Sequence, residues 1–258
     1  MGTRHIVVTG AGTGIGRAIA LNLATADTRL SLLARDTARL EQTAELARAA
    51  GAEVFVTGCD IQDRAQVDAA FDAAAAAHGP LQALVANSGV GGPNAPEAAG
   101  QADRFDELVS TNLNGTYYCL RAAERLLAPG PGQRQLVVIS SILARIGVPG
   151  YTGYCASKAA LLGLVRALAA ELAGDNVMVN AVCPGWVNTA MAHDGLEGMA
   201  AGMGISKDEA HAIAMQAVPL GRMGEPDEIA GFVNWLVSEH SVGITGQGLD
   251  MNGGAFMS

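Results

Sequence analysis

The sequence predicts an α/β fold, a doubly wound parallel sheet of about seven strands with helices on both faces. Short apolar runs alternate with alanine-rich stretches of helical length, which is the pattern of repeated strand–helix units. Several runs are apolar at consecutive positions, such as Ile6–Val8 and Leu136–Ile139. This is typical of strands that are covered on both faces. Parallel strands need right-handed crossovers, which place helices on each side of the sheet.

The predicted elements follow one another along the whole chain. Strands are predicted at 5–9, 29–34, 53–57, 81–86, 135–140, 177–182 and 243–251. Helices are predicted at 14–26, 37–50, 63–78, 102–128, 152–173 and 226–238. Pro80 and Pro226 lie at element edges, where the missing N–H is tolerated. Because no Pro/Ser-rich linker or long charge run divides residues 1–258, we expect a single domain.

One segment, residues 185–218, interrupts this alternation. It lacks strand character and is rich in methionine, glycine and alanine. It is interpreted either as an irregular surface excursion containing a helix or as a mobile lid, since long loops on a scaffold often carry binding. Its methionines serve either as adaptable filler or as the lining of a pocket for a bulky apolar substrate. We refer to residues 185–218 as the lid segment.

Composition excludes several classes of function. The 258 residues include 16 basic and 25 acidic ones, a formal net charge of −9. A surface of this sign repels phosphate backbones and anionic lipid, so we expect no nucleic-acid or membrane partner. The first apolar run, Ile6–Val8, is too short for a signal peptide, and no stretch reaches the roughly 18 apolar residues of a membrane span. A cytoplasmic protein is predicted.

The cysteines and histidines show no spacing typical of metal sites. Cys59, Cys119, Cys155 and Cys183 lie far apart and form no C-x-x-C pair. We therefore expect no metal site, and free thiols in a reducing compartment.

A glycine-rich stretch follows the first predicted strand. Residues Thr9–Gly16 read Thr-Gly-Ala-Gly-Thr-Gly-Ile-Gly, and a helical pattern begins at once. Glycines permit a tight turn and close approach to a ligand, and the helix then directs its free N–H groups at a diphosphate. The strand before and the helix after favour a dinucleotide site of the Rossmann-like kind over a glycine turn made for packing.

The spacing Thr-Gly-x-x-x-Gly-x-Gly resembles the short-chain dehydrogenase/reductase family. Further matches follow in chain order and extend the resemblance over nearly the whole sequence. They are Asn87-Ser88-Gly89, Asn112, Ser141, Tyr154-Cys155-Ala156-Ser157-Lys158 and Pro184-Gly185-Trp186-Val187-Asn188-Thr189. Ser88 stands where the family has alanine. The resemblance implies a single-domain, ketoreductase-like enzyme.

Three of these residues can carry acid–base chemistry. Tyr154 and Lys158, at i and i+4 of a predicted helix, share one face. A tyrosine with a pKa of about 10 is a poor base, and a nearby ammonium lowers that pKa toward the useful range. The Ser141 hydroxyl can donate to a carbonyl oxygen or a developing alkoxide. Each residue alone has a structural explanation, but their order after a nucleotide loop favours catalysis.

The resemblance implies a role for each site residue. Tyr154 is the general acid in reduction and the general base in oxidation; Lys158 lowers its pKa and holds the nicotinamide ribose. Ser141 orients the substrate oxygen, and Asn112 anchors a water of a proton relay, its alternative being to satisfy helix backbone. Asp60 contacts adenine or else caps a helix. The implied cofactor contacts are Gly10, Gly12, Thr13, Gly14, Ile15, Gly16, Arg35, Asp60, Ile61, Asn87, Gly89, Tyr154, Lys158, Pro184, Gly185, Val187 and Thr189.

The end of the second predicted strand bears on cofactor choice. Ala34 occupies the place where NAD-using relatives carry a ribose-binding carboxylate, and the Arg35 guanidinium can fork onto a 2′-phosphate. Asp36 is the rival, since it lies about 20 residues after the last glycine and can hold a 2′-hydroxyl. Thr13, where many NADP users have a basic residue, also argues for NAD. NADP(H) is predicted, with NAD(H) as the alternative.

Substrate and assembly follow only from the resemblance. Around 182–191 and 246–254 the chain resembles reductases of 3-oxoacyl thioesters or polyketide-like ketones. The alternatives are an NAD-dependent secondary or cyclic alcohol dehydrogenase and a non-catalytic nucleotide-sensing module, although the presence of both Tyr154 and Lys158 argues against the latter. Family members are commonly tetramers, and the apolar helices at 102–128 and 152–173 are the expected contacts of a homotetramer.

Overall fold

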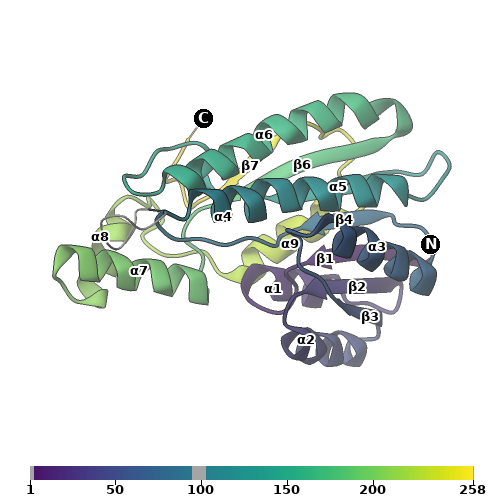
Figure 1. Cartoon of the computed structure of the whole chain (residues 1–258), viewed down its shortest axis with the longest axis horizontal. Helices are drawn as coiled ribbons and strands as arrows, with labels where there is room; N and C mark the ends of the chain where they lie inside the picture. Colours follow the sequence, from purple (N-terminus) through teal and green to yellow (C-terminus); the bar gives the residue numbers. More distant parts are fainter. Residues whose placement is uncertain (1–2, 95–102, 258) are drawn as a thin grey trace.

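The strands form one parallel sheet. The computed structural model describes residues 3–94 and 103–257. Within them seven strands pair in the order β3-β2-β1-β4-β5-β6-β7, every pair parallel (Figure 1). Their bounds are β1 Arg4–Thr9, β2 Thr28–Ala34, β3 Glu53–Gly58, β4 Ala83–Ala86, β5 Arg134–Ile139, β6 Val177–Pro184 and β7 Gly248–Met251. The predicted doubly wound, Rossmann-like parallel sheet is confirmed.

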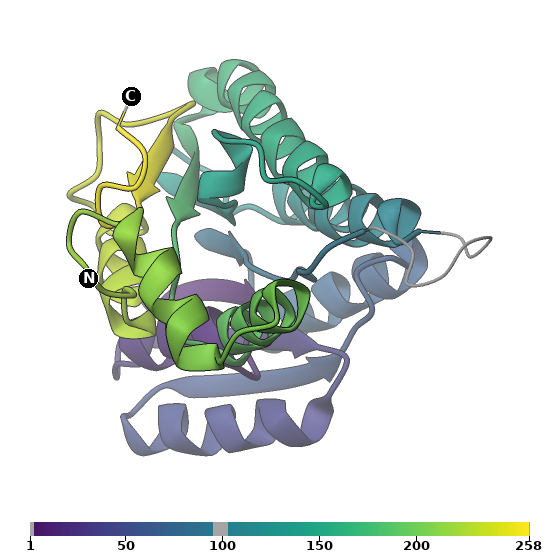
Figure 2. The same cartoon turned by 90° about the vertical axis from the view of Figure 1, so that its left-hand side faces the viewer.

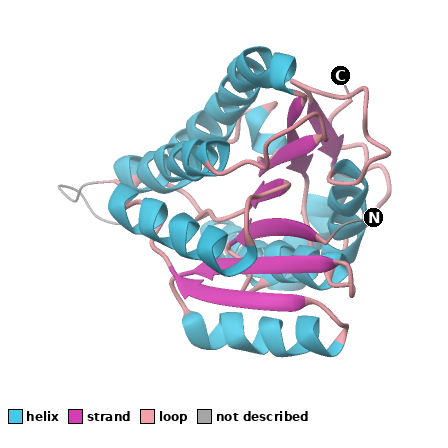
Figure 3. Cartoon of the chain, turned by 90° about the vertical axis from the view of Figure 1, so that its right-hand side faces the viewer, coloured by secondary structure: helices cyan, strands magenta, loops and turns pink. Residues whose placement is uncertain are grey.

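Helices cover both faces of this sheet. Their bounds are α1 Gly14–Leu23, α2 Thr37–Ala49, α3 Arg64–His78, α4 Phe105–Val109, α5 Thr116–Arg125, α6 Thr152–Leu172, α7 Ala190–Met203, α8 Lys207–Gln216 and α9 Pro226–Leu236. Helices α1, α2 and α9 pack on one face and α3, α5 and α6 on the other (Figures 1 and 3). Helices α7 and α8 lie beyond the carboxyl ends of the strands, in front of the sheet in Figure 2. No helix in the described part of the chain is long and apolar enough to cross a membrane.

The two-sided cover explains the continuous apolar runs. Ile6 and Val8 of β1 belong to the hydrophobic cluster under α1, α2 and α9, whereas Val7 belongs to the cluster under α3, α5 and α6. All three side chains are fully buried. Since successive side chains of a strand point to opposite faces, a strand between two helical layers must be apolar at every position.

Three predicted elements differ in the structure. The helix predicted at 102–128 is divided by a π-helical segment, Ser110–Gly115, and residue 102 lies outside the described residues. The last strand begins at Gly248 instead of 243, because Gly246 adopts a φ of 72°, which an extended strand does not contain. The lid segment holds two helices, α7 and α8, instead of one, and Gly204 with a φ of 67° separates them.

A buried histidine makes the fold sensitive to acid. His5 on β1 is 1% exposed. Its Nδ1 donates to the Gly79 carbonyl at 2.7 Å, and its Nε2 accepts from the Ser31 hydroxyl at 2.8 Å. With Nδ1 as donor and Nε2 as acceptor, the ring is neutral. Burial lowers the pKa of His5 to about 4.

We expect acid to unfold the chain partly through His5. The unfolded ring titrates near 6.5, so between that pH and about 4 the unfolded state binds more protons than the folded one. The free energy of unfolding should therefore fall by about 3 kcal/mol as the pH drops across this window, with no change from His5 above it. Urea unfolding at several pH values measures this, with the exposed His211→Gln variant as control. An identical pH dependence in His5→Gln and wild type would contradict it.

Candidate active site

The candidate site residues come together at the carboxyl ends of four neighbouring strands. Gly10 follows β1, Asn87 follows β4, Ser141 follows β5 and Gly185 follows β6. β1 and β4 are neighbours in the sheet although two strands separate them in sequence. In a doubly wound sheet, this switch in strand order opens a crevice in which ligands bind.

The glycine-rich loop after β1 is shaped in a way that only glycine permits. Gly10 and Gly14 adopt φ values of 68° and 52°. A Cβ on Gly16 would lie 2.3 Å from the Gly10 carbonyl oxygen and 2.4 Å from the Asn87 amide nitrogen. The loop therefore packs on itself and on the end of β4, leaving no room for a side chain.

The end of β4 holds this loop in place. The Asn87 Nδ2 donates to the carbonyls of Thr9 and Gly10 at 3.1 and 3.3 Å. The Thr9 hydroxyl in turn accepts from the backbone N–H groups of Asn87 and Ser88, both at 3.0 Å. Asn87 therefore supports the loop. Thr9 is the first residue of the predicted glycine-rich motif but was not among the predicted site residues; its hydroxyl, on the last residue of β1, ties the loop to the end of β4.

The start of α1 fits the diphosphate of a dinucleotide. Thr13 at its N-cap makes no side-chain capping bond, and the first turn contains no acidic residue. By contrast, Asp36 caps α2 and Asp63 caps α3. The free N–H groups and positive dipole end of α1 are thus available to an anion beside the glycine loop.

Arg35 and Asp36, which follow β2, are the two candidates for recognising the adenosine ribose or its 2′-phosphate, and their contacts differ. The Asp36 carboxylate accepts from the Arg39 N–H at 3.1 Å and lies 3.2 Å from the Arg39 Nε. Asp36 is therefore occupied as the cap of α2. Arg35 is exposed and forms no ion pair within residues 3–94 and 103–257.

Tyr154 and Lys158 lie together on α6. The Lys158 side chain is buried, its Nζ donates to the Ile139 carbonyl at 3.0 Å, and it lies 5.7 Å from the centre of the Tyr154 ring. Burial lowers the pKa of Lys158 to about 8. Burial also raises the pKa of Tyr154, opposed in part by a hydrogen bond with Ser141. The lowering of the Tyr154 pKa by Lys158 stays a prediction; in this structure the Lys158 ammonium donates to the carbonyl that ends β5.

Ser141 begins a short 3₁₀ turn, Ile142–Ala144, at the exit of β5. Its Oγ accepts from the Leu143 N–H at 3.1 Å, and the residue is 8% exposed. Because the backbone bond uses a lone pair, the hydroxyl proton stays free to be donated. The structure thus brings Ser141 against Tyr154, as the sequence predicted for a substrate-binding hydroxyl.

Asn112 lies fully buried in the π-helical segment. Its Oδ1 accepts from the Val90 N–H at 2.8 Å, and its Nδ2 donates to the Val90 carbonyl and the Ser157 hydroxyl at 3.0 and 3.2 Å. A Cβ on Gly89 would lie 3.0 Å from this Oδ1 and 3.5 Å from the Lys158 Nζ. Asn112 thus joins the loop after β4 to α6. Its water-anchoring role stays a prediction, and its two amide protons are already donated.

The remaining predicted contacts lie around the rim. Asp60 accepts from the Gln62 N–H at 3.1 Å, and Asp63 is the residue that caps α3, so the capping interpretation of Asp60 is wrong. The Ile61 side chain is 5% exposed and packs on Gly115. After β6, the Gly185 N–H donates to the Met251 carbonyl at 3.1 Å.

The lid segment begins directly over this crevice. Thr189 caps α7, and its methyl group lies 3.3 Å from the position of a Cβ on Gly14. The Met191 sulfur lies 2.9 Å from the position of a Cβ on Gly91. The start of α7 therefore spans from the glycine-rich loop to the segment after β4. A small separate hydrophobic cluster lies mostly in this segment; its buried residues are Leu196, Ala214, Met215 and Val218 of the segment and Met223 beyond it.

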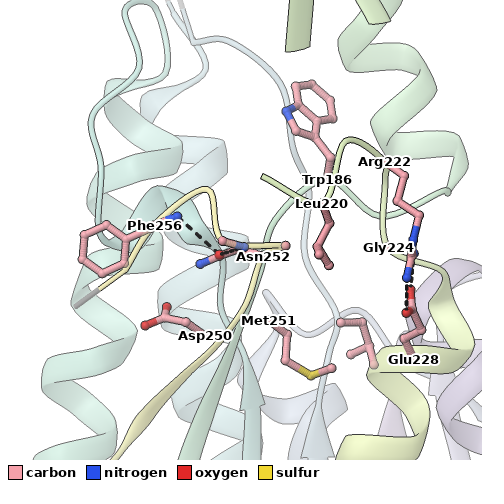
Figure 4. Close-up of a pocket in the computed structure, with 12 residues that line it drawn as sticks. Trp186, Leu220, Arg222, Gly224, Glu228, Asp250, Met251, Asn252 and Phe256 are labelled. Atoms are coloured by element: carbon pink, nitrogen blue, oxygen red, sulfur yellow. Dashed lines mark hydrogen bonds and ion pairs between the residues drawn. The ribbon is translucent and has the colours of Figure 1, made fainter. Parts of the chain in front are cut away.

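A cavity of about 380 Å³ lies next to Trp186, at the start of the lid segment (Figure 4). It lies between Trp186, the N-terminus of α9 and the stretch Asp250–Phe256 at the end of the chain. The Asp250 carboxylate and the Phe256 ring lie on the same side of it. None of the predicted site residues lies in this last stretch.

Comparison with known proteins identifies the family. The family model described as Enoyl-(Acyl carrier protein) reductase matches residues 10–255. The granaticin polyketide synthase putative ketoacyl reductase 1 of Streptomyces violaceoruber is 38% identical over 255 residues, which cover 96% of this chain and 91% of the relative. The 3-oxoacyl-(acyl-carrier-protein) reductase FabG of Staphylococcus aureus is 32% identical over 257 residues and 99% of both chains.

Solved structures agree with these relatives. A variant of actinorhodin polyketide ketoreductase, crystallised with NADPH, superposes with a TM-score of 0.90 at 33% identity, over 99% of both chains. Levodione reductase gives a TM-score of 0.90 at 28% identity, over 98% of both chains. With the site geometry described above, the chain belongs to the short-chain dehydrogenase/reductase family and is an oxidoreductase that uses a nicotinamide cofactor.

Proposed function

We propose that this enzyme reduces a ketone to a secondary alcohol with NADPH, and that Tyr154 supplies the proton. The proposal rests on one observation. Tyr154, Ser141 and Lys158 lie together, and the crevice that holds them also contains the glycine-rich loop and the uncapped start of α1. The same groups serve the reverse reaction, in which Tyr154 accepts the proton of the alcohol. Residues 1–258 act as one domain, with residues 185–218 as its lid.

The protein's part in the reaction is to hold the carbonyl and deliver a proton. NADPH, when bound, supplies the hydride that adds to the carbonyl carbon. The Ser141 hydroxyl donates to the carbonyl oxygen and stabilises the negative charge that develops there. The Tyr154 hydroxyl then transfers its proton to that oxygen, which completes the alcohol. Because burial raises the pKa of Tyr154, the group is protonated at neutral pH, as reduction requires.

Each end of the cofactor has residues that suit it. The loop Gly10–Gly16 and the start of α1 hold the diphosphate, Asp60 and Ile61 contact the adenine, and Asn87 and Gly89 contact the cofactor from the end of β4. Lys158 and the stretch Pro184–Thr189 hold the nicotinamide end. The exposed Arg35 forks onto the 2′-phosphate, and the use of Asp36 as a helix cap argues against its holding a 2′-hydroxyl. The bound NADPH of the actinorhodin relative agrees with this choice.

The substrate is proposed from the relatives and the lid segment together. Relatives named as ketoacyl and polyketide reductases favour a 3-oxoacyl thioester or a polyketide-like ketone. Met191 and Trp186, at the start of the lid segment, offer an apolar surface to such a molecule. A panel of such ketones, supplemented with cyclic ones and tested with both cofactors, identifies the class.

We expect Arg35→Ala to change cofactor preference. Loss of a charge-assisted bond to the 2′-phosphate should lower kcat/KM for NADPH by about 10- to 100-fold and leave that for NADH unchanged. Initial rates on the best ketone of the panel measure both values. Arg166→Ala is the matched control; it removes an arginine that is also exposed but lies on α6. Comparable kcat/KM for both cofactors in wild type, unaltered in Arg35→Ala, would rule out the NADPH assignment.

We expect the lid segment to become ordered over bound ligands. Its small cluster is separate from the two clusters on the sheet, so it can close as a unit and exclude water during hydride transfer. Amide hydrogen exchange in α7 and α8 should slow when NADP⁺ and product alcohol are bound together, while exchange in the last turn of α2, at the end away from Arg35, stays unchanged. Equal protection of α7 and α8 with and without ligands would contradict a lid.

We also propose a homotetramer in the cytoplasm. Along α6, Ala156, Ala159, Gly163, Ala167 and Ala170 are exposed at helical spacing and allow a second helix to approach closely. The four cysteines are free thiols, which favours a reducing compartment. Sedimentation equilibrium measures the oligomeric state.

A further inference from the structure

An ion pair joins the turn after Ser141 to the last strand of the sheet. The Arg145 Nε lies 3.3 Å from Asp250 Oδ1, and its Nη2 donates to the Gly248 carbonyl at 2.7 Å. Both side chains are 18% exposed, the lowest value among the ion pairs of the described residues. A charge pair with so little access to water is screened weakly and holds its geometry more firmly than a surface pair.

The Arg145 guanidinium is closely packed by Phe256 and Gly248. The Phe256 ring lies under it, with 5.9 Å between its central carbon and the ring centre. A Cβ on Gly248 would lie 2.6 Å from Nη2, so any side chain at this position would displace the guanidinium. The contacts therefore include a carboxylate, a carbonyl and an aromatic face, all from the stretch Gly248–Phe256.

Arg145 closes the turn that Ser141 opens. The Leu143 N–H donates to Ser141 Oγ at 3.1 Å, the Ala144 N–H to the Ser141 carbonyl at 3.0 Å, and the Arg145 N–H to the Ile142 carbonyl at 2.8 Å. Strand β6 runs between β5 and β7, and its Cys183 pairs with Asp250. The side chain of Arg145 thus reaches past β6 and fixes the turn on one side while β5 fixes it on the other.

We propose that Arg145 and Asp250 are positioning residues for Ser141. They hold the turn that begins at Ser141. The Ser141 hydroxyl therefore keeps its position beside Tyr154, where it can donate to the substrate oxygen. This inference rests on the proposed role of Ser141 in ketone reduction. A misplacement of a catalytic group by about 1 Å costs on the order of 10²-fold in rate.

The kinetic test separates positioning from simple stability. Rates are measured well below the thermal midpoint of every variant. Arg145→Met should lower kcat by roughly 10- to 100-fold and leave the NADPH dissociation constant, from fluorescence, unchanged. Arg145→Lys, which keeps the charge but loses the fork, should recover only part of that loss. Asp250→Asn should act in the same direction, and the double variant should lose less than the two separate losses combined.

Combining Arg145→Met with Ser141→Ala shows whether Arg145 affects kcat through the Ser141 hydroxyl. In Ser141→Ala, the further change Arg145→Met should have no effect on kcat, because the hydroxyl that it positions is gone. Arg121→Met, which breaks ion pairs with Glu124 and Glu171 at the outer surface, is the matched control and should leave kcat unchanged. A kcat loss from Arg145→Met that persists undiminished in Ser141→Ala would overturn the proposal.

A second readout does not depend on activity. Exchange of the Leu143 and Ala144 amide protons should accelerate in Arg145→Met and in Gly248→Ala, which displaces the guanidinium without changing the charge, but not in Arg121→Met. Unchanged exchange in both would overturn the proposal. If wild type reduces no ketone with either cofactor, the proposed function fails, while the exchange result still decides whether Arg145 holds this turn.

Discussion

Replacement of Tyr154 by phenylalanine is expected to lower kcat for ketone reduction by about 10²- to 10⁴-fold or more, which is the contribution of a positioned general acid. Only the hydroxyl is removed, and the ring keeps its place on α6 near the Lys158 ammonium. The fold and the affinity for NADPH should therefore be retained. Steady-state rates on the best ketone, far-UV circular dichroism and NADPH fluorescence titration measure the three quantities.

The matched control is Tyr151→Phe. Tyr151 precedes α6, and the residue four positions later is Cys155, so Tyr151 lacks the lysine that Tyr154 has at i+4. Its variant should keep near wild-type kcat. If Tyr154→Phe kept near wild-type kcat instead, the proton donor would be misassigned and Tyr151 would be the next residue to test. In the direction of alcohol oxidation, kcat/KM of wild type should rise with pH, because Tyr154 must lose its proton to act as base.

Replacement of Lys158 by methionine is expected to lower both turnover and cofactor affinity. The buried ammonium donates to the Ile139 carbonyl and lies next to the Tyr154 ring and the Gly89 backbone. Its loss removes the charge beside the phenol and the proposed donor to the nicotinamide ribose. The dissociation constant of NADPH should rise by about 10-fold, and kcat should fall on the order of 10²-fold or more.

The other lysine of the chain provides the control. Lys207 on α8 is exposed and pairs with Glu197, so Lys207→Met should change neither quantity. Fluorescence titration gives the affinity and stopped-flow absorbance gives the turnover. Wild-type affinity for NADPH together with near wild-type kcat in Lys158→Met would remove Lys158 from the proposed mechanism.

The layers of the fold could be predicted from the sequence, because a strand that is buried on both faces is apolar at consecutive positions. Ile6–Val8 is continuously apolar since helices cover both sides of β1. The break in the helix at Ser110–Gly115 leaves no such pattern in the sequence. It accompanies the bonds of Asn112 to Val90 and Ser157, which are tertiary contacts that no periodicity records. The two helices of the lid segment did have local signals, the Ser206–Glu209 capping box and Gly204 as a helix end.

That the candidate residues gather at one edge of the sheet was also predictable, because their motifs follow predicted parallel strands whose carboxyl ends meet there. The directions of their side chains were not. Asp36 directly precedes a predicted helix, but only the bond of its carboxylate to the Arg39 N–H shows that it caps α2. The Lys158 ammonium points to a carbonyl of β5, which shares no local sequence with α6. Arg145 and Asp250 lie 105 residues apart, and only the parallel order of β5, β6 and β7 brings them together.

The central claim is that the enzyme transfers a hydride from NADPH to a ketone carbon and a proton from Tyr154 to its oxygen. Product analysis by mass spectrometry, with NADPH carrying deuterium at both positions of nicotinamide C4, tests the hydride transfer most directly. The account predicts a single deuterium on the carbinol carbon for every cofactor oxidised, with both product and cofactor oxidation nearly abolished in Tyr154→Phe. Cofactor oxidation that leaves no deuterium in the alcohol, or that proceeds equally without a ketone, would contradict it.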